Sequence, residues 1–397
     1  MNTSVANTYN RKKITFSHGK GIYLFTNDNK KYIDLAAGIA VNLLGHSNKS
    51  LIDALQKQSK KLWHVSNLYQ IEEQEILARK LTNLSFADKV FFCNSGAEAV
   101  ECSIKAARRY QFSQGYKEKK NIITFKGSFH GRTLGTIAAS NNINHLEGFG
   151  LPLEGFINIE RNNLDQLLRV IDKNTAAILI EPIQGEGGIN VFDRDFLMNV
   201  ESIARDKKIL LLLDEVQCGM GRTGKMFAHE LFNIKPDIMA LAKGLGGGFP
   251  IGACLMTSPV GDAMNPGTHG STFGGNPLAM AVGNCVTDIV SNPDFLSDIS
   301  DKANLFHLKL NQIAKKYPNI ITDIKGLGLM IGIKCNIENT ILANELYKNG
   351  VLTVNAGDNV VRILPPLNIT IPEINKVTQI IKKSVQNIDK ENATKEN

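Results

Sequence analysis

The chain has few of the features that mark disulfide-rich, membrane-spanning or nucleic-acid-binding proteins. Its 397 residues include only six cysteines, widely spaced and without a Cys-x-x-Cys pair, so we expect neither a disulfide framework nor a metal site. No apolar run is long enough to cross a bilayer. The net charge is +7, but the basic residues are dispersed and no basic block is interleaved with aromatic residues, which argues against nucleic-acid binding.

The start of the chain also lacks the apolar core of a secretory signal peptide, so we expect a cytoplasmic location. What is present is an ordinary globular composition, with 43% hydrophobic and 21% charged residues. The length is sufficient for two domains with a large core.

Short β-rich runs alternate with helical stretches from about residue 88 onward. Apolar strands separated by helices are typical of a mainly parallel sheet with helices on both faces, so we predict an α/β fold. Ligands on such sheets bind beyond the carboxyl ends of the strands. The strands are expected at 89–93, 121–125, 176–180, 208–213 and 237–242, and helices at 97–110 and 195–206.

The two ends of the chain predict a second, smaller domain. Strands are expected at 20–25, 31–35, 328–333 and 360–364. Helical spacing of apolar residues lies at 50–61, 71–82, 278–291 and 298–316. We therefore predict a large α/β domain over residues 50–290 and a smaller α+β domain built from residues 1–49 and 291–397.

One lysine stands out at the end of an apolar strand. Lys243 is followed by Gly244, Gly246, Gly247 and Gly248. Glycines leave room for a flat group near the backbone, and apolar neighbours lower the pKa of a lysine so that its amine can act as a nucleophile. Lys243 is thus either a lysine that forms a Schiff base with an aldehyde cofactor or a solvated lysine beside a flexible loop.

Asp214 ends the most apolar strand of the chain, where packing does not explain a carboxylate. A buried carboxylate needs a partner, and the protonated ring nitrogen of pyridoxal 5′-phosphate (PLP) would be one. Val216 could then pack on the ring, and Gln217 could hydrogen-bond its oxygen substituent. The following Gly219-Met-Gly-Arg-Thr-Gly-Lys225 resembles a P-loop, but Met226 stands where Mg²⁺ binding requires Ser or Thr, so ATP binding is not expected.

Two further segments follow strands and could bind charged groups. Ser95 and Gly96 begin a helix, whose free backbone N–H groups could bind a phosphate or could simply be N-capped. Phe129 could stack on an aromatic ring and Arg132 could bind a carboxylate, although a core aromatic and a surface arginine explain the same residues. His130 could be a catalytic base, but a packing role is favoured.

Together these segments resemble the class III, ornithine-type, family of PLP-dependent aminotransferases, within fold type I. The resemblance covers roughly residues 15–390 and implies a large domain with a mainly parallel sheet plus a smaller α+β domain. Its most specific motifs are Asn94-Ser-Gly-Ala-Glu-Ala-Val-Glu101, Leu212-Leu-Asp-Glu-Val-Gln-Cys-Gly-Met-Gly-Arg-Thr-Gly224 and His269-Gly-Ser-Thr-Phe-Gly-Gly-Asn-Pro277.

The resemblance implies that Lys243 forms a Schiff base with PLP and that Asp214 pairs with the ring nitrogen. It also implies a homodimer with shared active sites, in which Thr272 reaches the cofactor of the partner subunit. The other implied cofactor contacts are Ser95, Gly96, Ala97, Phe129, Glu215, Val216 and Gln217. The implied substrate contacts are Arg132 and Ser271 for the amino donor and Arg362 for glutamate, with Glu186 pairing with Arg362 when the longer donor is bound.

The activity implied by the resemblance is transfer of the terminal amino group of N2-acetyl-L-ornithine to 2-oxoglutarate, in arginine biosynthesis. Alternative amino donors within the family are N-succinyl-diaminopimelate, succinylornithine, ornithine and 4-aminobutyrate. Ile39 falls where ornithine-specific members are expected to carry a tyrosine, which argues against free ornithine. A non-catalytic PLP-binding regulator on the same fold is the alternative from a different class, and the presence of Lys243, Asp214 and Arg132 argues against it.

Overall fold

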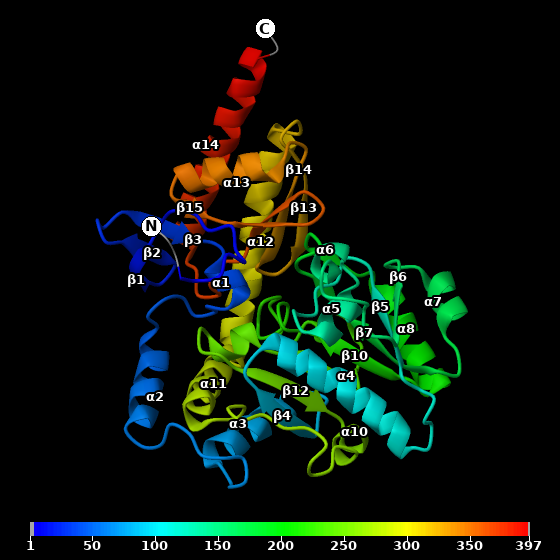
Figure 1. Cartoon of the computed structure of the whole chain (residues 1–397). Helices are drawn as coiled ribbons and strands as arrows, with labels where there is room; N and C mark the ends of the chain where they lie inside the picture. The colour runs from blue at the N-terminus through cyan, green and yellow to red at the C-terminus, as the bar shows by residue number, and fades with distance from the viewer. Residues whose placement is uncertain (1–3, 396–397) are drawn as a thin grey trace.

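A seven-stranded sheet lies at the centre of the larger part of the molecule. In the computed structural model, which describes residues 4–395, its strands follow the order β4-β12-β11-β10-β7-β5-β6 (Figure 1). Neighbouring strands are parallel except at β12, which runs antiparallel to β4 and β11. The predicted α/β fold with a mainly parallel sheet is therefore confirmed. The strands are β4 (Lys89–Cys93), β5 (Asn121–Phe125), β6 (Phe156–Ile159), β7 (Thr175–Ile180), β10 (Leu210–Asp214), β11 (Ile238–Leu241) and β12 (Gly252–Met256).

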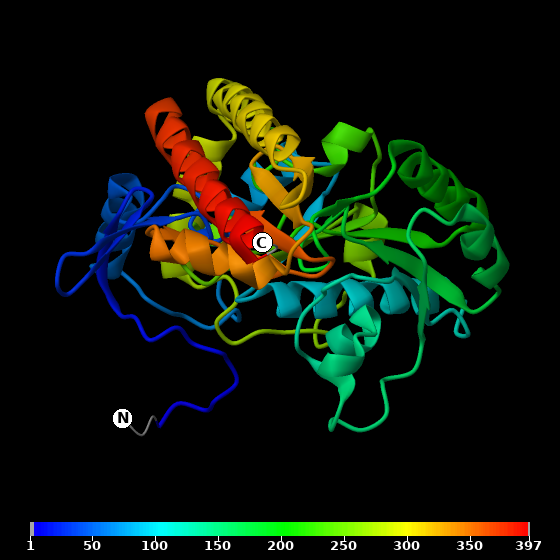
Figure 2. The same ribbon diagram turned by 90° about the horizontal axis from the view of Figure 1, so that it is seen from above.

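Alternate side chains of the central strand pack on opposite faces of this sheet. Leu210 and Leu212 belong to a buried cluster with α4 (Gly96–Ser113), whereas Leu211 and Leu213 belong to the cluster that includes α8 (Arg194–Lys207). Figure 2 shows these helices on opposite sides of the sheet. The strand is buried at every position, as expected when helices cover both faces.

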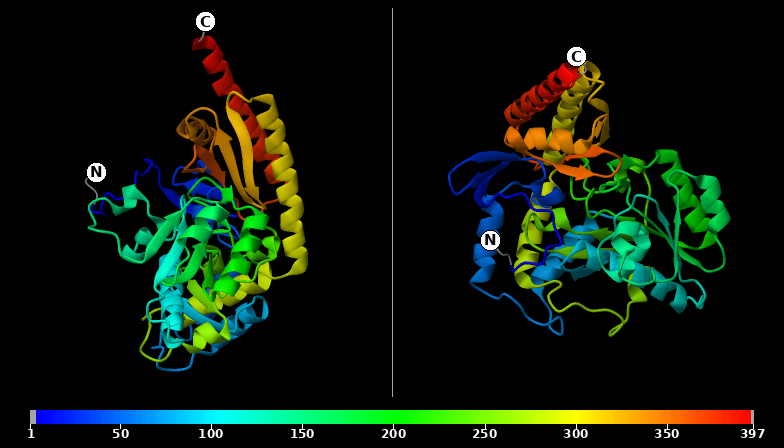
Figure 3. Two further views of the ribbon diagram at one scale, coloured as in Figure 1. Left: turned by 90° about the vertical axis from the view of Figure 1, so that its right-hand side faces the viewer. Right: turned by 45° about the horizontal axis from the view of Figure 1, so that its top comes forward.

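The smaller part of the molecule joins the two ends of the chain. Strand β15 (Val351–Leu352) pairs with β3 (Lys31–Asp34) in the sheet β1-β2-β3-β15, and a second sheet has the order β13-β14-β17-β16. Helix α12 (Pro293–Lys316) extends from the larger part into the smaller one (Figure 3). The other elements of this part are β1 (Phe16–Lys20), β2 (Tyr23–Thr26), β13 (Ile321–Leu327), β14 (Met330–Cys335), β16 (Val354–Ala356), β17 (Val360–Ile363), α13 (Asn339–Lys348) and α14 (Ile371–Lys395).

The remaining helices and short strands surround the central sheet and its carboxyl edge. They are α1 (Ala37–Ala40), α2 (Lys49–Ser59), α3 (Glu72–Asn83), α5 (Leu134–Ser140), α6 (Ile143–Leu146), α7 (Leu164–Val170), β8 (Ile183–Gln184), β9 (Asn190–Val191), α9 (His229–Phe232), η1 (Lys243–Gly246), α10 (Ser258–Asp262) and α11 (Pro277–Val290). Among residues 4–395, no helix combines the length and apolar composition that a membrane crossing requires.

Several predicted elements differ from the observed ones. The strand expected at 20–25 is interrupted at Gly21, and the strand expected at 328–333 begins only at Met330, because Gly328 lies in the β13–β14 turn. Strand β12 is absent from the prediction because Gly-Ala-Cys-Leu-Met contains no β-branched or aromatic residue, so its conformation depends on pairing with β4 and β11. The domain boundaries at 50–290 and at 1–49 with 291–397 stay a prediction.

The loop that resembles a P-loop in sequence joins the two parts of the molecule. The side chain of Arg222 is fully buried, and its Nη1 donates to the carbonyls of Leu329 at 3.2 Å and Pro365 at 2.6 Å. The N–H of Leu329 donates in return to the carbonyl of Arg222 at 2.9 Å. The loop thus holds the β13–β14 turn against the larger part.

We predict that Gly328→Ala destabilises the protein more than Gly21→Ala does. Both glycines have a left-handed φ, +59° and +56°, so each substitution carries a backbone cost of about 1–2 kcal/mol. A Cβ at position 328 would also lie 2.4 Å from Cα of Thr223, whereas nothing lies within 4 Å of one at position 21. Thermal unfolding midpoints at one scan rate should fall from wild type to Gly21→Ala to Gly328→Ala, and equal midpoints for the two variants would contradict the prediction.

Candidate active site

A cavity of about 400 Å³ opens at the carboxyl ends of β4, β7, β10 and β11. This is the edge at which ligands are expected on a parallel sheet. Further walls come from the loop after β5 and from residues 248–251, which lead into β12. The structure brings most of the predicted site residues to this cavity, namely Ser95, Gly96, Ala97, Phe129, Arg132, Asp214, Val216, Gln217 and Lys243.

Lys243 lies two residues after the end of β11, in a strained backbone conformation. Its φ is +43°, a region that non-glycine residues rarely adopt, and it opens the single turn η1. No side chain among residues 4–395 forms an ion pair or hydrogen bond with its amine. Burial lowers the pKa of the Lys243 ammonium, although the carboxylates of Glu186 and Asp214 act in the opposite direction. The neutral, nucleophilic amine is therefore more populated than in an exposed lysine.

Asp214 is held in place by His130. The carboxylate Oδ2 lies 2.9 Å from His130 Nδ1, and Oδ1 accepts the backbone N–H of Val216 at 3.1 Å. Both side chains are buried, and Nε2 of His130 has no hydrogen-bond partner among the described residues. The packing role favoured for His130 is therefore incomplete, since the residue also lines the cavity and fixes the orientation of Asp214.

The start of helix α4 presents backbone N–H groups to the cavity. Ser95 caps the helix, since its Oγ accepts the N–H of Glu98 at 3.3 Å and donates to the carboxylate of Glu98 at 2.9 Å. The N–H groups of Gly96 and Ala97 precede any intrahelical acceptor and remain available, next to the positive end of the helix dipole. These two amides could bind an anionic group, with the hydroxyl of Ser95 partly committed to the cap.

The two arginines that could bind a substrate carboxylate differ in whether an acidic side chain already pairs with them. Arg132 has its guanidinium carbon 5.5 Å from the centroid of the Phe129 ring, and no described residue forms an ion pair with it. Arg362 is buried and forms a bidentate ion pair with Glu186, with Nη1–Oε1 of 2.5 Å and Nη2–Oε2 of 2.9 Å. Arg362 reaches the cavity wall through Gln217, whose Oε1 accepts from Nη1 at 3.3 Å.

A second cavity, of about 560 Å³, adjoins the first and shares Phe129 and Arg132 with it. Glu186 and His145 also line it. The ring of His145 stands edge-on to Phe129, with 5.9 Å between centroids. The two cavities together could hold an elongated ligand that passes Phe129.

Besides Glu186 and Arg362, three predicted site residues do not line the first cavity. The Glu215 carboxylate accepts the N–H groups of Ala228 and His229 and lies 2.9 Å from Nδ1 of His229, so it is bound away from the cavity. This placement gives no support to its predicted contact with a cofactor. Ser271 accepts a hydrogen bond from Asn94 at 3.3 Å, and Thr272 is exposed to solvent. Neither lines the cavity of its own chain.

Glu181, which the sequence places directly after an apolar strand as a candidate site carboxylate, also lines the cavity. Its Oε1 accepts the N–H of Phe129 at 2.7 Å, and its Oε2 accepts the N–H of Gly185 at 3.3 Å. Burial, followed by the nearby charge of Asp214, raises the pKa of the Glu181 carboxyl. The signal for Glu181 is its position directly after the apolar strand β7, because Asp214 occupies the equivalent place on β10.

The donor set of the cavity fits PLP, the cofactor implied by the sequence resemblance. The amides of Gly96 and Ala97 suit its phosphate, the carboxylate of Asp214 suits its ring nitrogen, and the unpaired amine of Lys243 suits its aldehyde. Val216 packs closely against the start of helix α4 in the cavity wall, because a Cβ at Gly96 would lie only 2.7 Å from Cγ1 of Val216.

The known proteins that this chain resembles are aminotransferases. The model of the family aminotransferase class-III matches residues 4–385. The chain is 51% identical to the acetylornithine aminotransferase of Brucella melitensis over 381 residues, which cover 96% of this chain and 94% of that protein. It resembles the solved N-acetylornithine aminotransferase from Stenotrophomonas maltophilia, with a TM-score of 0.84 and 35% identity over 96% of this chain and 97% of that one. It also resembles an ornithine aminotransferase from Toxoplasma gondii with partial occupancy of PLP at its active site, with a TM-score of 0.94 and 30% identity over 98% of this chain and 93% of that one.

We predict that His130→Leu weakens the binding of PLP, whereas His229→Leu does not. Each histidine contacts a buried carboxylate at 2.9 Å, Asp214 for His130 and Glu215 for His229, but only the first pair faces the cavity. Loss of a partner at a buried carboxylate costs about 1–3 kcal/mol, so the affinity for PLP should fall about tenfold. Absorbance titration of the apoprotein with PLP measures this, and an equal loss of affinity in both variants would contradict the prediction.

Proposed function

The chain belongs to the class III aminotransferase family, and from this premise we propose that it transfers the terminal amino group of N2-acetyl-L-ornithine to 2-oxoglutarate. The products are N-acetyl-L-glutamate 5-semialdehyde and L-glutamate, and the reaction belongs to arginine biosynthesis. Relatives named acetylornithine aminotransferase, at 44–51% identity over most of the chain, support this choice of donor. A cytoplasmic location stays a prediction.

The observation that carries the proposal is a difference in ion pairing between two arginines near one reactive lysine. Arg132 has no ion-pair partner in the described part of the chain and suits the α-carboxylate of the donor, whereas Arg362 is masked by Glu186. An aminotransferase must bind two different amino acids in turn at one site. A second arginine that becomes available only when Glu186 moves away would let glutamate bind without attracting the carboxylate of the donor.

We further propose that PLP is bound covalently by Lys243. PLP supplies an electron-withdrawing ring that stabilises negative charge on the substrate carbon. The amine of Lys243, with its lowered pKa, would remove the proton from that carbon and return it to the cofactor side. Asp214, oriented by His130, would keep the ring nitrogen protonated.

The remaining cavity residues would hold and orient the cofactor and donor. Gly96 and Ala97, with Ser95, would bind the phosphate through their N–H groups and hydroxyl, and Phe129 and Val216 would face the ring. Gln217 would hydrogen-bond the ring oxygen. The second cavity beside Phe129 offers space for an acylated amino-acid arm, which supports a donor longer than 4-aminobutyrate.

The side chain of Ile39 has no polar group that could bind the free α-amine of ornithine. Ile39 lies in a left-handed turn, two residues before the cavity residue Val41, and packs half-buried against an apolar cluster that includes Ala40. A side chain without a hydroxyl at this position supports an acylated donor over free ornithine.

We also propose a homodimer whose subunits share active sites. The loops at 62–69 and 271–275 are joined by bonds from the Asn67 side chain to the carbonyls of Ser271 and Gly274. They expose several large apolar side chains, an arrangement typical of a protein interface. These are Leu62, Trp63, Leu68, Tyr69 and Phe273. Thr272, exposed in the same loop, would complete the phosphate site of the second subunit.

We predict that the holoenzyme prefers N2-acetylornithine to ornithine, 4-aminobutyrate and N-succinyl-diaminopimelate. In single half-reactions followed by cofactor absorbance, kcat/KM should be at least about tenfold higher for N2-acetylornithine, because an unmatched polar group costs more than 1 kcal/mol. Lys243→Ala should lower turnover by about 10²- to 10⁴-fold, the usual contribution of a positioned acid–base group. A higher kcat/KM with any of the other donors would refute the proposed substrate, and full activity of Lys243→Ala would refute the role of the lysine.

Mixed dimers test the role of Thr272. We predict that Lys243→Ala and Thr272→Ala chains are each impaired alone at limiting PLP and recover activity when refolded together. Only a mixed dimer with cross-subunit contacts contains one intact site, so random mixing should restore about a quarter of wild-type activity. Failure to recover, in samples shown to contain mixed dimers, would mean that Thr272 does not act across the interface.

A further inference from the structure

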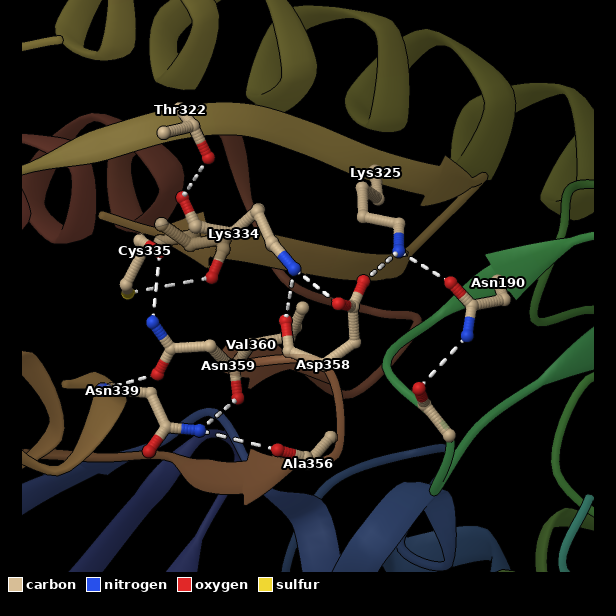
Figure 4. A network of polar contacts seen from close by, with 12 residues as sticks. Asn190, Thr322, Lys325, Lys334, Cys335, Asn339, Ala356, Asp358, Asn359 and Val360 are labelled. Carbon is tan, nitrogen blue, oxygen red and sulfur yellow. Dashed lines mark hydrogen bonds and ion pairs between the residues drawn. The ribbon is translucent and has the colours of Figure 1, made fainter. Parts of the chain in front are cut away.

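Asp358 joins three segments of the smaller part of the molecule. It lies with Asn359 in the turn between β16 and β17, and both have a left-handed φ, +52° and +54°. Its carboxylate pairs with Lys325 of β13, at 3.0 Å, and with Lys334 of β14, whose Nζ also donates to the Asp358 carbonyl at 2.6 Å (Figure 4). One carboxylate therefore draws two strands toward this turn.

The same network extends to the loop that carries Glu186. Lys325 also donates to the side-chain oxygen of Asn190, as Figure 4 shows, and the Asn190 amide donates to the carbonyl of Gly187 at 2.8 Å. The N–H of Gly357, next to Asp358, donates to the carbonyl of Glu186 at 2.8 Å. The loop is thus bonded to the turn on both sides of position 187.

The contact between turn and loop is tight. A Cβ on Gly188 would lie 2.7 Å from the carbonyl oxygen of Gly357 and 2.8 Å from Cβ of Asp358. The loop therefore follows the position of the turn closely. Strand β17, which leaves this turn, carries Arg362, the partner of Glu186.

We propose that Asp358 is a positioning residue that holds Glu186 on Arg362 and thereby controls access of dicarboxylate substrates to this arginine. The inference rests on the proposed exchange of two substrates at one site. Glu186 and a substrate carboxylate compete for the same guanidinium, so any contact that favours the Glu186-bound state weakens substrate binding there by the same factor. The hydrogen bonds and ion pairs that connect Asp358 to this loop favour the Glu186-bound state, because they fix the backbone of the loop that carries Glu186.

Asp358→Asn is the variant that tests this role. Asparagine has nearly the same shape and tolerates a left-handed φ, so the turn should persist while the attraction for two lysines is lost. Couplings of this kind are worth a few-fold in affinity, so glutamate should bind about three- to tenfold more tightly in its half-reaction. Asp358 also lines the second cavity, where the arm of the donor would lie, so the half-reaction with N2-acetylornithine is measured beside that with glutamate and its kcat/KM should change less.

A second measurement reports the position of the loop without relying on activity. Amide hydrogen exchange in peptides that cover residues 183–191 and 354–360 should become faster in Asp358→Asn, since the N–H of Gly357 loses a fixed acceptor. Asp298→Asn is the matched control. Asp298 is as exposed as Asp358, 48% against 46%, and pairs with Lys302 within helix α12. It should change neither glutamate binding nor exchange in these peptides.

Combination with Glu186→Gln separates positioning from a general effect on stability. If Asp358 acts through Glu186, then adding Asp358→Asn to Glu186→Gln should change glutamate binding no further. Unchanged or weaker glutamate binding in Asp358→Asn, equal changes in both half-reactions, or full additivity in the double variant would each overturn the inference. A wild-type enzyme without activity on N2-acetylornithine would instead refute the proposed donor, while the glutamate measurements would still decide the role of Asp358.

Discussion

The site depends on keeping the amine of Lys243 buried and, within residues 4–395, without an acidic side chain paired to it. Three carboxylates act on Lys243 electrostatically, and each is committed elsewhere: Asp214 to a histidine, Glu181 to two backbone N–H groups, and Glu186 to an arginine. If any of them were released, it could pair with Lys243 and stabilise the protonated amine. The lowered pKa of Lys243 is therefore a property of the whole polar network, rather than of apolar surroundings alone.

The topology of the sheet explains why these groups meet. These groups lie at the carboxyl ends of three neighbouring strands: Asp214 is the last residue of β10, Glu181 directly follows β7, and Lys243 lies two residues after β11. Parallel strands end at the same edge, so groups far apart in sequence converge there without any need for local sequence patterns. The strained φ of Lys243 is maintained because the buried strand β11 fixes the chain before it and the glycine-rich turn η1 fixes the chain after it.

The order of the strands also determines which residues of the site can be predicted from the sequence. Lys243 and Asp214 could be found because a polar residue at the end of an apolar strand has few explanations. The contact between His130 and Asp214 could not be predicted, because the two residues are 84 positions apart and their pairing depends on the order of the strands. Glu215 illustrates the same limit. It directly follows Asp214, but the chain turns at the end of β10 and directs its carboxylate to His229, so adjacency in sequence does not give adjacency to the cavity.

The pair formed by Glu186 and Arg362 constrains how a second substrate can enter. The side chain of Arg362 is 1% exposed, whereas that of Glu186 is 32% exposed. Moving the carboxylate into solvent therefore costs far less than moving the guanidinium, so Glu186 is the member that leaves. A buried guanidinium without a carboxylate is itself unfavourable, which means that Glu186 can depart only as another carboxylate arrives. Exchange of one carboxylate for another keeps the buried charge balanced throughout, and it requires no rearrangement of the strand that carries Arg362.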